Sequence, residues 1–112
     1  MMPNDKLEAC MAGIVIKIDE DLFDLVPGYL QNRRQDISKM RESLAQGDFE
    51  SIKISGHSMK GSGGGYGFDE ITEIGGLIEK AAKENNGVVV GELIARLADY
   101  LANIEVVRDV GE

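Results

Sequence analysis

Cysteine and histidine are almost absent from this chain of 112 residues, which contains one of each. The single cysteine, Cys10, has no partner for an internal disulfide, so we expect a reducing cytoplasmic compartment and an inert thiol. The single histidine, His57, excludes multi-histidine metal sites. Any nucleophilic or acid–base imidazole chemistry must therefore occur at His57.

Long apolar runs and an excess of positive charge are also missing. No apolar stretch approaches the ~18 residues that span a bilayer, and residues 1–18 lack the basic start and apolar centre of a signal peptide. Twelve basic and twenty acidic residues give a net charge of −8. Such an acidic balance argues against nucleic acids and anionic membranes as partners.

The residues that are present suit one small globular domain. Apolar residues make up 43% of the chain and charged residues 29%, enough for one core and a soluble surface. Residues 1–18 are interpreted as an N-terminal arm, because Ile14, Ile16 and Ile18 alternate with other residues as in a short strand. Residues 19–112 are interpreted as a helical domain.

Four segments of helical periodicity follow the arm. They run from Asp19 to the turn at 46–48, from Asp48 as an N-cap to the turn at 65–67, from Asp69 to the turn at 84–87, and from there to Ile104. Residues 104–110 either continue the last helix or form a strand beside Ile14–Ile18. We predict an all-α fold, an antiparallel up-down-up-down four-helix bundle with a short extended N-terminal arm, acting as a monomer.

The segment around His57 is rich in glycine, with six of the fourteen glycines within residues 55–67. One interpretation is a flexible loop, since each helical glycine costs ~1 kcal/mol relative to alanine. Another is a nucleotide-binding loop, but neither G-x-G-x-x-G nor G-x-x-x-x-G-K-[ST] fits these residues. Because an apolar stripe continues from Phe49 through Met59 to Tyr66, we favour a helix.

Steps of ~100° per residue place His57 about 130° from this apolar stripe, facing solvent. Lys53 precedes it by one turn, and Lys60 follows it by three residues. Two ammonium groups on the same side of the helix would stabilise incoming phosphoryl oxygens. The alternative is an ordinary surface histidine beside ordinary lysines.

Small and apolar residues on the same side of the helix favour contact with another protein. Gly61 and Gly64, at i+4 and i+7 from His57, leave room for a partner surface to approach. Ile54, at i−3, is an apolar residue facing water, as expected for a small docking patch.

The motif His57-Ser58-Met59-Lys60-Gly61-Ser62, followed by Gly67, resembles the His-x-x-Lys-Gly-Ser signature of the histidine-containing phosphotransfer (HPt) domain. The flanking Asn32-Arg33-Arg34, Gly47-Asp48-Phe49 and Gly67-Phe68 are similar to that family's layout. The resemblance implies that His57 accepts a phosphoryl group and that Lys60 is its basic neighbour. It also implies that Gly61 admits the partner domain and that Ser62 belongs to the packing of the motif.

The resemblance further implies a phosphorelay intermediate that exchanges a phosphoryl group with response-regulator receiver domains, a hybrid histidine kinase, or both. We expect no kinase activity of the chain alone, since it has no nucleotide-binding loop and no evident acidic cluster near His57. No cofactor or metal site is expected in this chain, and Mg²⁺ is expected on the receiver. Transfer then needs mainly positioning and charge stabilisation.

Two other functions stay open. The chain could be a non-phosphorylated interaction module that binds receivers or partner helices through the Ile54 surface. An enzyme with His57 as general base is less favoured, because no carboxylate lies at i±3 or i±4 to orient the imidazole. The sequence does not identify the receiver or kinase, the direction of phosphoryl flow, or whether the chain belongs to a larger hybrid protein.

Overall fold

The computed structural model describes residues 14–109, and the expectations for residues 1–13, including Cys10, lie outside the described residues. The elements in chain order are β1 (Ile14–Asp19), α2 (Glu20–Phe23), α3 (Val26–Ala45), α4 (Phe49–Ser62), a 3₁₀ turn η1 (Gly64–Tyr66), α5 (Asp69–Lys83), α6 (Gly87–Asn103) and β2 (Ile104–Asp109). The described chain is mostly helical, as predicted. Within it, no helix combines the length and apolar character needed to cross a membrane.

The helix ends follow local rules that the sequence already shows. Pro27 lies in the first turn of α3, where its missing N–H breaks no helical hydrogen bond. Gly47 separates α3 from α4 with a φ of +72°, a conformation that favours glycine. Asp48 caps α4, because its side chain accepts a hydrogen bond from the Ser51 N–H at 3.1 Å.

The helix that carries His57 ends at Ser62, a few residues before the turn at 65–67 that was predicted to close it. The Gly64 N–H donates to Thr72 Oγ1 of α5 at 2.7 Å, and the chain tightens into η1. The physical reason is the run of three glycines at 63–65. Their low helix propensity lets a side chain of the next helix bind the backbone.

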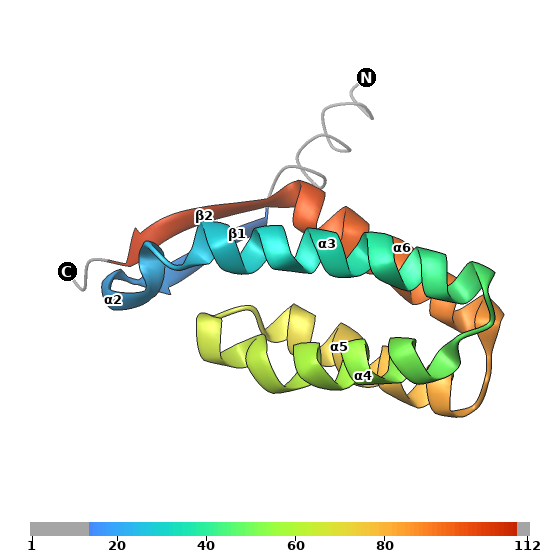
Figure 1. Ribbon diagram of the computed structural model, residues 1–112. Coiled ribbons are helices and arrows are strands. Elements are labelled where there is room, and N and C mark those ends of the chain that lie inside the picture. The colour runs from blue at the N-terminus through green and yellow to red at the C-terminus, as the bar shows by residue number, and fades with distance from the viewer. Residues whose placement is uncertain (1–13, 110–112) are drawn as a thin grey trace, which may run out of the picture.

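The four long helices lie in two layers (Figure 1), with α3 and α6 in one and α4 and α5 in the other. Each long helix contacts the next one in the chain, and α3 also contacts α6. Apolar side chains that are almost fully buried fill the interior, among them Met40, Ile52, Met59, Phe68, Ile71, Ile74, Ile78, Ile94 and Leu97. Tyr29 and Tyr100 also belong to this core.

The segment after α6 forms a strand and does not continue the helix. β2 pairs with β1 in parallel, with Ile14 opposite Ile104 and Ile18 opposite Arg108, at the same end of the molecule as α2 (Figure 1). Both strands are rich in β-branched residues, which favour extended structure. The all-α prediction therefore needs a correction, because a two-stranded parallel sheet joins the two ends of the described chain.

Candidate functional site

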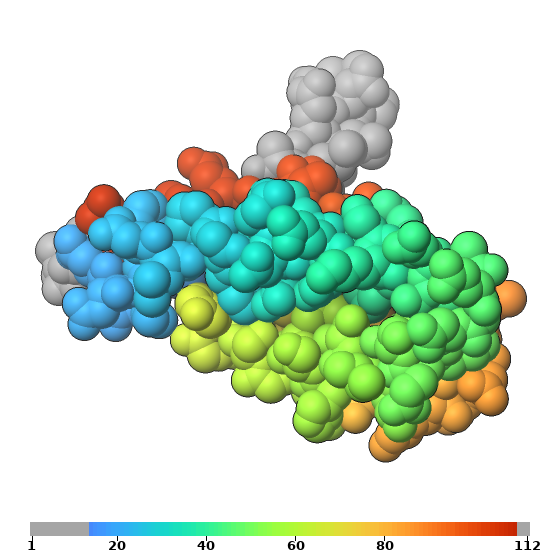
Figure 2. Space-filling view, viewed as in Figure 1, coloured from blue at the N-terminus to red at the C-terminus, as the bar shows by residue number. Residues whose placement is uncertain are grey.

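His57 lies near the middle of α4 with a side chain that is 70% exposed. The residues on the inner side of the same helix, Ile52, Gly56 and Met59, are buried. His57 therefore faces outward, as the periodicity predicts. Figure 2 shows that α4 is open to solvent on the face below α3.

A carboxylate from the neighbouring helix α5 holds the imidazole. Glu79 Oε2 lies 3.0 Å from His57 Nδ1, and Glu79 Oε1 lies 3.3 Å from Lys60 Nζ. The Glu79 side chain is only 14% exposed, so the carboxylate is confined between the two helices. The sequence prediction missed Glu79, since it considered only carboxylates within the same helix as His57.

The charge state of Glu79 determines which imidazole nitrogen is free. Burial raises the pKa of Glu79, but the hydrogen bonds from Lys60 and His57, with the positive charge of Lys60, lower it by more, so the pKa lies below its ordinary value. The ionised carboxylate can only accept hydrogen bonds, so a neutral imidazole carries its proton on Nδ1. Nε2 then keeps its lone pair, and none of the residues from 14 to 109 hydrogen-bonds it.

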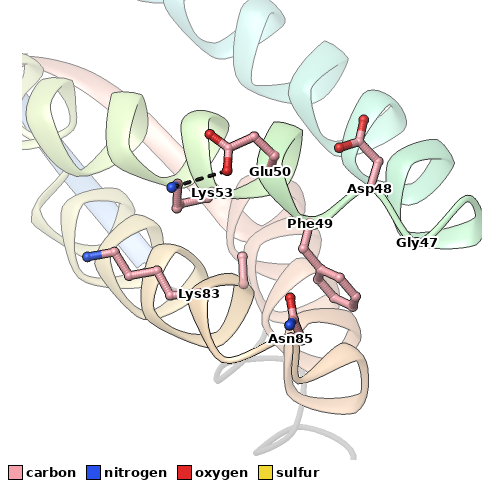
Figure 3. A pocket seen from close by; sticks show the side chains of 8 residues that line it. Gly47, Asp48, Phe49, Glu50, Lys53, Lys83 and Asn85 are labelled. Atoms are coloured by element: carbon pink, nitrogen blue, oxygen red, sulfur yellow. Dashed lines mark ion pairs between the residues drawn. The ribbon is translucent and has the colours of Figure 1, made fainter.

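The two lysines predicted to flank His57 are placed differently. Lys60 is 52% exposed and shares Glu79 with His57. Lys53 instead pairs with Glu50 at 3.2 Å, and Figure 3 shows it turned toward that carboxylate beside an open pocket of about 430 Å³. The structure thus brings Lys60, and not Lys53, into the hydrogen-bonded group around His57.

Of the three residues predicted to contact a partner, Ile54 and Gly61 lie on α4 with His57, whereas Gly64 lies beyond the end of that helix. Ile54 is 59% exposed on α4. A Cβ added to Gly61 would meet no atom within 4 Å outside the local backbone of its own helix, so the space beside this turn is open. Gly64 lies in η1, with its N–H bound to Thr72, and so does not occupy the predicted helical i+7 position from His57.

The last residue of the motif, Ser62, ties α4 to α3. Its Oγ lies 2.9 Å from the hydroxyl of Tyr29. The Tyr29 ring stacks on Tyr66 and Phe68, with centroids 4.2 and 5.9 Å away, and the Arg33 guanidinium lies over it at 4.6 Å. This aromatic cluster fixes the C-terminal end of the helix that carries His57.

Comparison with protein-family models matches residues 24–106 to the Hpt domain. The chain belongs to the Hpt domain family. Neither the curated proteins nor the solved structures gave a match. Hpt domains carry out histidine phosphotransfer in phosphorelays, where they interact with receiver domains and histidine kinases. The matched region of this Hpt domain includes the whole motif and the chain's single histidine.

Replacing Lys60 by alanine is expected to slow phosphoryl transfer to this Hpt domain about fivefold. A half-exposed charge contributes ~1 kcal/mol or less, and that energy corresponds to roughly this factor in rate. The free energy of unfolding should change by no more than ~0.5 kcal/mol, since the side chain is at the surface. Transfer rates from a phosphorylated receiver and thermal unfolding measure the two effects.

Lys80→Ala is the matched control for this prediction. Lys80 is an exposed lysine of α5 on the side that faces α6, beside Leu77 and Val89. Its removal should leave both transfer and stability nearly unchanged. Normal transfer by Lys60→Ala together with a large loss of stability would contradict the assignment of Lys60.

Proposed function

We propose that this Hpt domain accepts and donates a phosphoryl group at His57 Nε2, in exchange with receiver-domain aspartates of a two-component phosphorelay. The observation that carries the proposal is an exposed imidazole whose Nδ1 is held by Glu79 at 3.0 Å while Nε2 stays free. The four long helices, as an antiparallel up-down-up-down bundle, would serve as the rigid support.

In the proposed step, the lone pair of His57 Nε2 attacks the phosphorus of an aspartyl phosphate. The N–P bond forms, the bond between phosphorus and the aspartate oxygen breaks, and its electron pair leaves with the carboxylate. Nε2 carries no proton, so none has to be removed. The ring becomes cationic, and the Glu79 carboxylate, hydrogen-bonded at Nδ1, stabilises that charge.

The remaining requirements of the reaction would come from the partner. Lys60 supplies a point charge for phosphoryl oxygens, while the Mg²⁺ that neutralises further charge is proposed to be bound by the receiver. The sequence contains no nucleotide-binding loop. The phosphoryl group would therefore reach His57 from a phosphorylated receiver or a hybrid histidine kinase.

Receiver docking is proposed to centre on Ile54. This side chain is 59% exposed and lies at i−3 from His57, one turn along the same side of α4. An exposed aliphatic residue next to a reactive group is typical of a small interaction patch. The interface of a transient relay complex is modest in area, so one central side chain can supply much of the affinity.

Ile54→Ser is expected to weaken receiver binding about tenfold, the loss produced by removing one central apolar contact. Raising the salt concentration should weaken binding less. Lys53 and Lys60 already pair with Glu50 and Glu79, and salt at physiological strength screens exposed charges beyond ~8 Å. Titration of a receiver against both proteins, at low and at high salt, gives the comparison.

Val88→Ser is the matched control for docking, because Val88 is an aliphatic residue of α6 that is 74% exposed. Its replacement should leave receiver binding unchanged. Normal binding by Ile54→Ser, with binding abolished by salt, would refute the apolar patch and assign docking to the lysines.

The test of the proposed function is a transfer reaction with receivers that carry labelled phosphate and Mg²⁺. Label should move to the chain as a phosphoramidate, which is labile in acid and stable in base. Receiver binding without any transfer would favour the second candidate, a non-phosphorylated module that binds receivers or partner helices through the Ile54 surface.

A further inference from the structure

Helices α4 and α5 meet backbone to backbone at two buried glycines, Gly56 and Gly75. A Cβ added to Gly75 would lie 2.6 Å from Lys60 N and 2.8 Å from Gly56 O, and one added to Gly56 would lie 2.8 Å from Glu79 N. Carbon atoms need about 3.5 Å to neighbouring heavy atoms. A side chain at either position would therefore push the helices roughly 1 Å apart.

The atoms that these glycines meet belong to the residues around the imidazole. Gly56 directly precedes His57, and Gly75 lies one turn before Glu79 on the same side of α5. The two helices hold His57 Nδ1 and Glu79 Oε2 at 3.0 Å. A hydrogen bond weakens steeply beyond about 3.5 Å, so separating the helices by such an amount removes it.

We propose that Gly56 and Gly75 are positioning residues: their contact sets the helix spacing at which Glu79 holds His57 in the Nδ1–H tautomer. Glycine is a poor residue for a helix interior, and here its missing side chain serves the site next to it. The part of this inference that concerns transfer rests on the proposed function. The tautomer of His57 does not depend on it.

The first test is the ¹⁵N NMR spectrum of the imidazole, at a pH where the ring is neutral. His57 is the single histidine, so its two ring nitrogens give the only imidazole signals. The unaltered protein should show mainly the Nδ1–H tautomer, and Gly75→Ala should shift the population toward Nε2–H. Gly28→Ala, in α3 with no atom within 4 Å of the added Cβ, should leave it unchanged.

The second test compares rates of label transfer from a phosphorylated receiver. Gly75→Ala should slow transfer about tenfold. A 1 Å misplacement of a reacting group itself can cost about a hundredfold, and Glu79 acts only through His57. Glu79→Ala should cause a similar loss. Adding Gly75→Ala to Glu79→Ala should cause little further loss, because both changes remove the same interaction.

Several results would overturn this proposal. One such result is a folded Gly75→Ala protein that keeps the Nδ1–H tautomer. Another is a double variant in which the losses in transfer rate of Gly75→Ala and Glu79→Ala multiply. If Gly75→Ala does not fold, the same measurements are made on Gly56→Ala. If neither variant folds, the glycine contact stabilises the core as a whole, and the positioning role is refuted. A tautomer shift with no label on unaltered His57 would support the positioning role and refute the proposed phosphotransfer.

Discussion

His57→Gln is expected to accept no detectable label from a phosphorylated receiver, a loss of more than about a thousandfold, as for other variants that lack their nucleophile. The glutamine amide has no nucleophilic lone pair of comparable reactivity. It can still donate a hydrogen bond to Glu79, so the variant removes the nucleophile and preserves a polar contact of similar reach. The measurement is label transfer over time from receiver to chain.

The stability of this variant separates chemistry from folding. The side chain of His57 is 70% exposed, so the free energy of unfolding should change by no more than ~0.5 kcal/mol. In the unaltered protein the label should be lost in acid and kept in base. Because the chain has no second histidine, undiminished transfer to His57→Gln would place the acceptor on another type of residue and refute the assignment.

Periodicity and capping residues predicted most of the fold because these signals are local. The outward direction of His57 follows from the buried residues at neighbouring helical positions, Ile52, Gly56 and Met59. Asp48 and Gly47 set the turn between α3 and α4 by their own conformations. The apolar segment after Asn103 suited either a helix or a strand. The segment forms a strand because it pairs with β1, which is distant in sequence.

The parts of the site that the sequence did not predict depend on contacts between helices. Glu79 reaches His57 from α5, whose distance from α4 is set by backbone contact. A glycine in the buried stripe of each helix, Gly56 and Gly75, was the available signal. The predicted placement of Lys53 beside His57 was wrong for a different reason. Its partner Glu50 stands at i−3, where oppositely charged side chains of one helix regularly meet.

Gly61→Leu is expected to lower the rate of receiver-to-His57 transfer about a hundredfold, because the receiver loses access to the imidazole. This factor equals the cost of misplacing reacting atoms by about 1 Å. Side chains of a helix lean toward its N-terminus, so a leucine at position 61 leans over the turn that carries His57. Reaction needs the phosphorus about 3–3.5 Å from the nucleophile. An isobutyl group beside the imidazole prevents a receiver from coming that close.

The same substitution should not destabilise the protein. Outside the local backbone of its own helix, a Cβ at position 61 meets no atom within 4 Å. Replacing a helical glycine raises helix propensity by up to ~1 kcal/mol. Thermal midpoints of Gly61→Ala and Gly61→Leu should therefore equal or exceed that of the unaltered protein. The alanine variant, with one methyl group, should transfer faster than the leucine variant.

Gly28→Leu is the matched control for this prediction, since Gly28 is a helical glycine of α3 whose surroundings are equally open. It adds the same exposed leucine away from His57, and its transfer rate should match that of the unaltered protein. A stable Gly61→Leu variant with unchanged transfer would refute steric access as the role of Gly61. An unfolded one would mean that Gly61 packs against a neighbouring helix, in conflict with the open space beside it.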